Sequence, residues 1–96
     1  RMEQSIEDSR KAVDLDPEYL MARNNLALAL IADRQAEKGL EEYTKMLAMT
    51  DDPQDLDETA VGDLMEARAQ YPDIPEFQTA IELVVARITE LDDEED

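Results

Sequence analysis

The chain has 96 residues, of which 26 are acidic and 9 basic, so its net charge is −17. Nucleic-acid binding and attraction to anionic membranes both need basic side chains, and this balance disfavours both kinds of partner. The chain has no Cys and no His, which excludes disulfides, thiol nucleophiles, imidazole bases and the usual zinc sites.

The length and the apolar content of 43% predict one small domain with a modest core. Only two Gly occur, strand-like alternation is absent and helix formers dominate, so we expect an all-α protein. The chain begins with Arg1, and its helical pattern starts within a few residues. We therefore expect a fragment of a longer cytoplasmic protein, with any targeting segment upstream.

The first predicted helix covers residues 2–15, where apolar and small residues recur three and four apart. We expect Asp16 to cap the next helix, with Pro17 at its first position. That second helix, over 18–33, has almost no polar face, which predicts a central helix covered on several sides.

A turn at 33–35 leads to the third predicted helix, over 36–49. Its inward side is expected to carry Leu40, Tyr43, Met46 and Leu47. Its outward side is expected to carry Glu37, Lys38, Glu41, Glu42 and Lys45.

After a loop at 50–54, Asp55 and Glu58 have the spacing of a capping box for a fourth helix over 56–71. Two prolines break the chain at 71–75, and a fifth helix follows over 76–91. Its apolar stripe and polar back are typical of the terminal helix of a solenoid. The acidic tail, 92–96, is expected to be disordered.

One spacing recurs along the chain. Small or apolar residues four and three apart, followed by a proline five later, occur at Ser5, Ser9, Ala12 and Pro17, and again at Ala60, Leu64, Ala67 and Pro72. The first part of the spacing also occurs at Gly39, Tyr43 and Met46.

This pattern resembles the second helix of a tetratricopeptide repeat, a family of helix–turn–helix units with a period of about 34 residues. Ser5 and Gly39 are separated by that period, and Leu26, Ala27 and Leu30 stand where the family's first helix carries its key residues. Other family sites differ here: the Trp site holds Arg23, the inter-helix Gly site Arg34, the second aromatic site Ala36 and the Pro site Asp51.

The resemblance implies an antiparallel helix–turn–helix array, a solenoid of about five helices within one domain over 1–91. Residues 1–16 would be half a repeat, 17–53 a full repeat, and 54–91 a divergent helix pair whose first member looks like a second-helix unit.

Proteins of this family resemble binding scaffolds, in which first helices line a concave groove. The resemblance places Met21, Asn24, Asn25, Leu28 and Ile31 at the groove as partner-binding residues. The alternative is that Leu28 and Ile31 simply pack against another part of this chain, or against a missing upstream repeat. Members that grip acidic chaperone tails use a clamp of Lys, Arg and Asn, but only Asn25 matches it here, so that subtype is rejected.

The sequence gives little support for calcium binding or for acid–base catalysis. Asp55, Asp57 and Glu66 match three places of a calcium-binding loop, but Ala60 stands where that loop needs Gly. The adjacent pairs Glu41/Glu42 and Asp57/Glu58 would point apart on a helix, so no acid–base pair is expected. We expect neither enzyme activity nor a cofactor or metal site.

The charge is uneven along the chain. Residues 1–50 carry 7 basic and 10 acidic groups, whereas residues 51–96 carry 2 basic and 16 acidic groups. The expected acidic flank comprises Asp51, Asp52, Asp55, Asp57, Glu58, Asp63 and Glu66. Steering of a basic partner, adaptation to high salt and a merely solvated surface all account for it.

The sequence thus predicts a protein–protein interaction scaffold that presents an apolar groove and an acidic flank to a protein or peptide, including a basic one. Two alternatives stay open: a self-association element of a homo-oligomer, and an accessory domain of a larger enzyme or regulatory chain.

Overall fold

The computed structural model describes residues 2–94, and every regular element within that range is a helix. The elements are α1 (Met2–Leu15), α2 (Leu20–Ala32), α3 (Ala36–Leu47), α4 (Pro53–Leu56), the π-helical η1 (Asp57–Val61), α5 (Gly62–Gln70) and α6 (Glu76–Glu94). Because α4, η1 and α5 follow one another without a break, the protein has five helical rods over these residues, as its sequence predicts.

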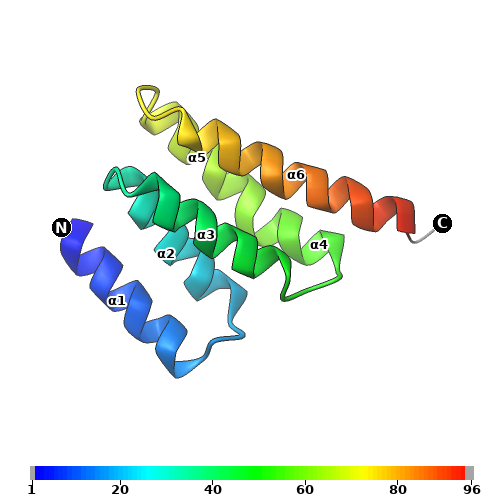
Figure 1. Ribbon diagram of the computed structural model, residues 1–96, viewed down its shortest axis with the longest axis horizontal. Helices are drawn as coiled ribbons and strands as arrows, with labels where there is room; N and C mark the ends of the chain where they lie inside the picture. The colour runs from blue at the N-terminus through cyan, green and yellow to red at the C-terminus, as the bar shows by residue number, and fades with distance from the viewer. Residues whose placement is uncertain (1, 95–96) are drawn as a thin grey trace.

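The rods are arranged around α2. This helix packs against α1 and α3 and touches η1, while α6 packs against α3 and against the rod formed by α4, η1 and α5. Figure 1 shows α1, α3 and α6 following one another across the molecule, with α2 behind α3 and α5 behind α6. The absence of a polar face on α2 is explained by this central position.

Apolar side chains form two separate clusters. The main cluster contains Ala27, Ile31, Tyr43, Met46, Leu56, Ala60, Leu64, Ile74, Phe77, Ala80, Val84 and Leu91. The minor cluster, between α1 and α2, contains Val13, Ala22, Leu26 and Leu30. The apolar stripe expected on the last rod faces the main cluster, except that Val85 is 44% exposed, and the rod over 53–70 turns Leu56, Ala60 and Leu64 to the same cluster.

The turn between α2 and α3 is short, and the two helices pack closely beyond it. Arg34 has a φ of 63°, and the N–H groups of Arg34 and Gln35 donate to the carbonyls of Ile31 and Leu30, which closes the end of α2. On α3, a Cβ on Gly39 would lie 2.5 Å from Ile31 Cγ1 and 2.9 Å from the Ala27 carbonyl oxygen. Only a residue without a side chain allows α2 and α3 to approach this closely.

Two expected helix caps are wrong. Asp16 does not cap α2: its main-chain carbonyl accepts from the Tyr19 N–H at 3.1 Å in a turn, and α2 begins only at Leu20. The fourth rod begins at Pro53, earlier than expected, because Pro favours the first helical position. Asp52 caps it by accepting from the Gln54 N–H at 2.9 Å, so Asp55 lies inside the first turn.

Two further expectations need correction. Glu42, expected on the outward side of α3, is buried because it forms an ion pair with Arg23 of α2. Residues 92–94 of the expected disordered tail belong to α6, which Leu91 anchors in the main cluster close to its end. Residues 95–96 lie outside the described part of the chain.

Candidate functional site

A groove with a volume of about 450 Å³ opens where α1 and α5 flank α2. Its floor is apolar and comes from Leu28, Ala29 and Ala32 of α2. Its walls carry polar groups: Ser5 and Ser9 on α1, Asn25 on α2, and Asp63, Glu66 and Gln70 on α5. Ala67, Tyr71 and Phe77 complete the lining.

The groove exists because two of its three floor residues are alanines. Ala29 and Ala32 face it from α2, and Ala67 faces it from α5, so the helices leave space between them. Leu28 also packs on the main cluster, which ties the floor to the core.

A buried hydrogen-bond chain supports the acidic wall. Tyr43 of α3 donates its hydroxyl to Asn24 Oδ1 at 2.7 Å, and Asn24 Nδ2 donates to Asp63 Oδ2 at 3.1 Å. Tyr43 and Asn24 are fully buried, whereas Asp63 is exposed on α5. The chain therefore runs from the core to the groove and fixes one oxygen of the Asp63 carboxylate.

Burial strongly raises the pKa of the Tyr43 hydroxyl, and the negative charge of Asp63 raises it further. Tyr43 therefore remains a neutral donor at physiological pH. Because the Asn24 amide oxygen accepts from Tyr43, its NH₂ group is the one that faces Asp63.

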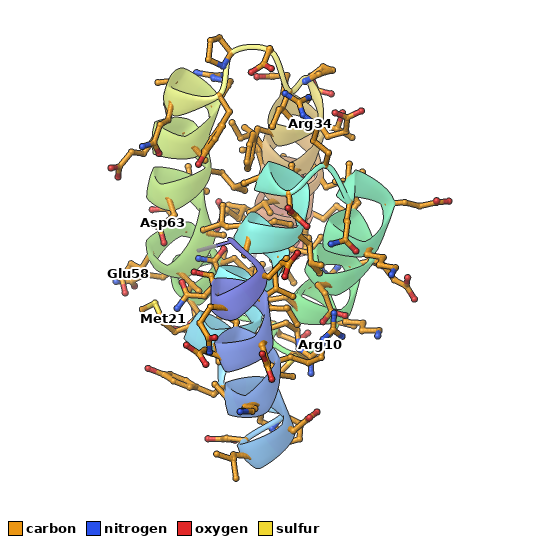
Figure 2. The ribbon with its side chains drawn as sticks, turned by 90° about the vertical axis from the view of Figure 1, so that its left-hand side faces the viewer. Arg10, Met21, Arg34, Glu58 and Asp63 are labelled. Carbon is orange, nitrogen blue, oxygen red and sulfur yellow. The ribbon has the colours of Figure 1, made fainter. Side chains whose placement is uncertain are left out.

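The structure divides the expected partner-binding residues. Asn25 and Leu28 line the groove. Met21 is 43% exposed and lies on the same side of the molecule as Asp63, but outside the groove lining (Figure 2). Asn24 and Ile31 are fully buried, so neither offers its side chain to a partner. Ile31 thus packs in the core, as the alternative interpretation has it.

The expected acidic flank is not one surface, because Asp51 and Asp52 precede the rod over 53–70 and the other five residues lie on different sides of that rod. Asp63 and Glu66 line the groove, whereas Asp52 and Asp57 line a second hollow of about 370 Å³ together with Ile88 and Asp92. Each of the remaining three has a partner within the fold: Asp51 pairs with Arg87 of α6, Asp55 with Thr50 and Glu58 with Gln54.

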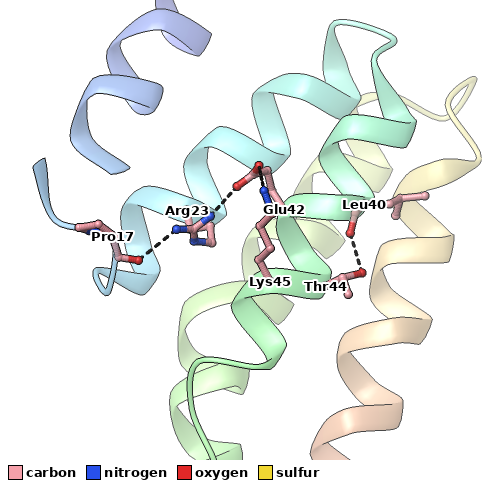
Figure 3. Close-up of polar contacts among 6 residues, drawn as sticks. All are labelled: Pro17, Arg23, Leu40, Glu42, Thr44 and Lys45. Atoms are coloured by element: carbon pink, nitrogen blue, oxygen red, sulfur yellow. Dashed lines mark hydrogen bonds and ion pairs between the residues drawn. The ribbon is translucent and has the colours of Figure 1, made fainter. Parts of the chain in front are cut away.

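Arg23 of α2 forms polar contacts with residues of two other segments (Figure 3). Its Nη1 donates to Glu42 Oε1 at 2.7 Å, and its Nη2 donates to the Pro17 carbonyl at 3.1 Å. Lys45 lies 3.5 Å from the other Glu42 oxygen. The Arg23 and Glu42 side chains are only 11% and 12% exposed, so the pair is a largely buried ion pair between α2 and α3.

The carboxylate pairs considered for catalysis are separated in the structure. Glu42 is buried beside Arg23 while Glu41 is exposed, and Asp57 lines the second hollow while Glu58 binds Gln54. Within residues 2–94, no group of three or more Asp or Glu side chains is arranged to hold a metal ion.

Sequence reasoning did not identify most of the groove lining. Ser5 and Ser9 belong to the recurring spacing, which does not show what their side of the helix faces, and no pattern marks Gln70. Ala29 and Ala32 are short side chains on α2, but Ala22 and Ala27 of the same helix are buried in the clusters, so side-chain size alone does not mark the groove.

No protein-family model, curated protein or solved structure matches the chain in the comparisons made. Of the helices over 2–94, none combines the length and the apolar character needed to cross a membrane.

Proposed function

We propose that this chain is a protein-interaction scaffold of the tetratricopeptide-repeat type, which presents the groove between α1, α2 and α5 to a protein or peptide partner. The groove itself carries the proposal. Its volume of about 450 Å³ is in the usual range of ligand sites, and its apolar floor lies between polar walls. A peptide can bury side chains on such a floor and form hydrogen bonds to the walls.

The order of helix contacts supports a repeat array. α2 pairs with α3, and the rod over 53–70 pairs with α6; these two pairs meet through η1 on α2 and α6 on α3. The first helices of the two pairs thus contact each other, and so do the second helices, as in stacked repeats. In this arrangement the rod over 53–70 takes the place of a first helix, which differs from the second-helix place that its spacing suggested.

The α2–α3 hairpin also supports the resemblance. Arg34 occupies the family's inter-helix Gly site, and its positive φ is the conformation for which Gly is favoured. Gly39, at the start of the repeated spacing, lies so close to α2 that a Cβ there would be 2.5 Å from Ile31 Cγ1.

Self-association is the second candidate function, and two exposed apolar residues favour it. Leu15 is 88% exposed and Tyr19 53% exposed, both near the α1–α2 connection. The outward side of α1 is less suited to an interface, because Gln4 bonds Asp8 and Lys11 pairs with Glu7 there. A role as an accessory domain is compatible with either function.

The groove is tested by filling it. Asn25 is exposed and lines the groove, so the Asn25→Trp variant should fold and obstruct it; Lys38→Trp, on the exposed side of α3, is the matched control. Proteins captured on the immobilised chain and on both variants are quantified by mass spectrometry. We expect captured partners that survive Lys38→Trp and are lost with Asn25→Trp.

Circular dichroism should show equal helicity for both variants. Identical capture by both would contradict binding in the groove. Light scattering over a range of protein concentrations tests the second candidate, and a mass that stays monomeric would exclude self-association.

A further inference from the structure

The charges around the groove are of one sign. Its lining contains the carboxylates of Asp63 and Glu66, one helical turn apart on α5, and contains no Lys or Arg. Within residues 2–94, no side-chain hydrogen bond or ion pair engages Glu66, and only one oxygen of Asp63 is held by the buried chain. Both carboxylates therefore keep acceptor capacity toward the groove.

A partner that covers these carboxylates removes water from them. Taking a carboxylate out of water is costly unless a cation or hydrogen-bond donors replace that water. A neutral or acidic segment would leave the two charges poorly compensated. A segment with a lysine or arginine compensates them, and its aliphatic stem can lie on Leu28, Ala29 and Ala32.

We infer that the groove binds a segment of a partner protein in which a lysine or arginine is flanked by apolar residues, with its cationic group against Asp63 and Glu66. The inference rests on the proposed function and specifies the chemistry of its partner. The occupant is selected by charge complementarity with this pair of side chains, and not by the general acidity of the chain.

The orientation of Asp63 contributes to the selection. Asn24 is fully buried and is itself held by Tyr43, so the Asp63 carboxylate is positioned before a partner arrives. A preorganised acceptor loses less conformational freedom on binding than a freely rotating one.

The test uses a displayed library of short random peptides selected on the immobilised chain at physiological salt. Three proteins are compared: the unmodified chain, the double variant Asp63→Asn/Glu66→Gln, and the control Asp57→Asn/Asp92→Asn. Both double variants remove two negative charges, but the control removes them from the second hollow. The Asp63→Asn change leaves an amide oxygen that can still accept from Asn24, so the fold is kept.

We expect peptides selected on the unmodified chain and on the control to be enriched in Lys or Arg beside apolar residues. The best of these peptides should bind Asp63→Asn/Glu66→Gln about tenfold more weakly and the control less than about twofold more weakly, since close ion pairs contribute far more than distant screened charges. A version of the peptide with Lys or Arg replaced by Gln should bind the unmodified chain about as weakly as the double variant.

Equal weakening by both double variants would overturn the inference, because it would mean general attraction to an acidic surface. Failure to select any peptide enriched in Lys or Arg would overturn it as well. The Asn25→Trp variant separates this failure from that of the proposed function. Peptides blocked by Asn25→Trp but insensitive to Asp63→Asn/Glu66→Gln show a groove without charge selection, whereas peptides insensitive to both show that the groove is not the site.

Discussion

The two apolar clusters of this protein differ in how many helices they join. The main cluster draws on α2, α3, α4, η1, α5 and α6, whereas the minor cluster joins only α1 to α2. Cooperative stability therefore resides in the main cluster, and α1 is attached through a much smaller apolar surface. Since α1 supplies one wall of the groove through Ser5 and Ser9, the candidate site lies between the most and the least firmly held parts of the molecule.

The strongest way to disturb the main cluster is Phe77→Ala. Phe77 is fully buried and stacks on Tyr71 with ring centroids 5.7 Å apart. Removing the ring should lower the free energy of unfolding by about 3–5 kcal/mol, because a large cavity remains. Denaturant unfolding followed by circular dichroism measures the loss. A reduction of about 0.5 kcal/mol or less, which is the range of surface substitutions, would contradict the burial of Phe77 in the main cluster.

The close approach of α2 and α3 is tested by adding a single methyl group. Gly39→Ala places a Cβ against Ile31 and should cost about 1–3 kcal/mol through overpacking. Gly62→Ala is the matched control: nothing lies within 4 Å of its Cβ, so it should stabilise the protein by about 0.4–1 kcal/mol. Thermal unfolding measures both variants, and a change of the same sign in both would contradict the packing argument.

The minor cluster is tested by Val13→Ala, which removes buried apolar surface from α1. At about 0.8 kcal/mol per buried methylene-sized group, the loss should be about 1.5 kcal/mol. We expect amide hydrogen exchange to become faster in α1 while exchange in α6 changes little. Equal acceleration in both helices would show that the two clusters unfold as one unit.

The smallest effect concerns the exposed pair between Arg34, in the α2–α3 turn, and Asp73, in the α5–α6 turn. The hydrogen bond from Arg34 lowers the pKa of Asp73 below its usual value of 3.8. The pair therefore adds stability above pH 3.8, and this contribution is lost as the pH falls through the lowered pKa. Unfolding of the unmodified chain and of Asp73→Asn should differ at neutral pH and converge in acid; a constant difference would contradict the linkage.

The helices could be predicted from the sequence because their signals are local. Periodic apolar residues and the prolines at 72 and 75 mark rods and breaks regardless of the surroundings. Ala60 and Leu64, which belong to the recurring spacing, both lie in the main cluster. The cap at Asp16 failed because a turn through Tyr19, together with the Arg23 bond to Pro17, holds the chain outside the helix.

The site was less predictable because it depends on contacts between distant segments. Asn24 occupies a position expected to be exposed, and only its bonds to Tyr43 and Asp63, 19 and 39 residues away, explain its burial. Glu42 is buried for a similar reason, since Arg23 compensates its charge. The part of the groove wall that α1 forms could not be predicted, because helical periodicity does not show which side of α2 is covered by α1.

The left-handed backbone of Arg34 has a cost, while its side chain makes a contact that Gly would lack. A residue with a Cβ gives up roughly 1–2 kcal/mol in this region, and Gly would avoid that loss. Gly would also remove the guanidinium that connects the two turns through Asp73. Arg34→Gly would therefore remove the backbone strain in the α2–α3 turn. It would also remove the ion pair that connects this turn to the α5–α6 turn.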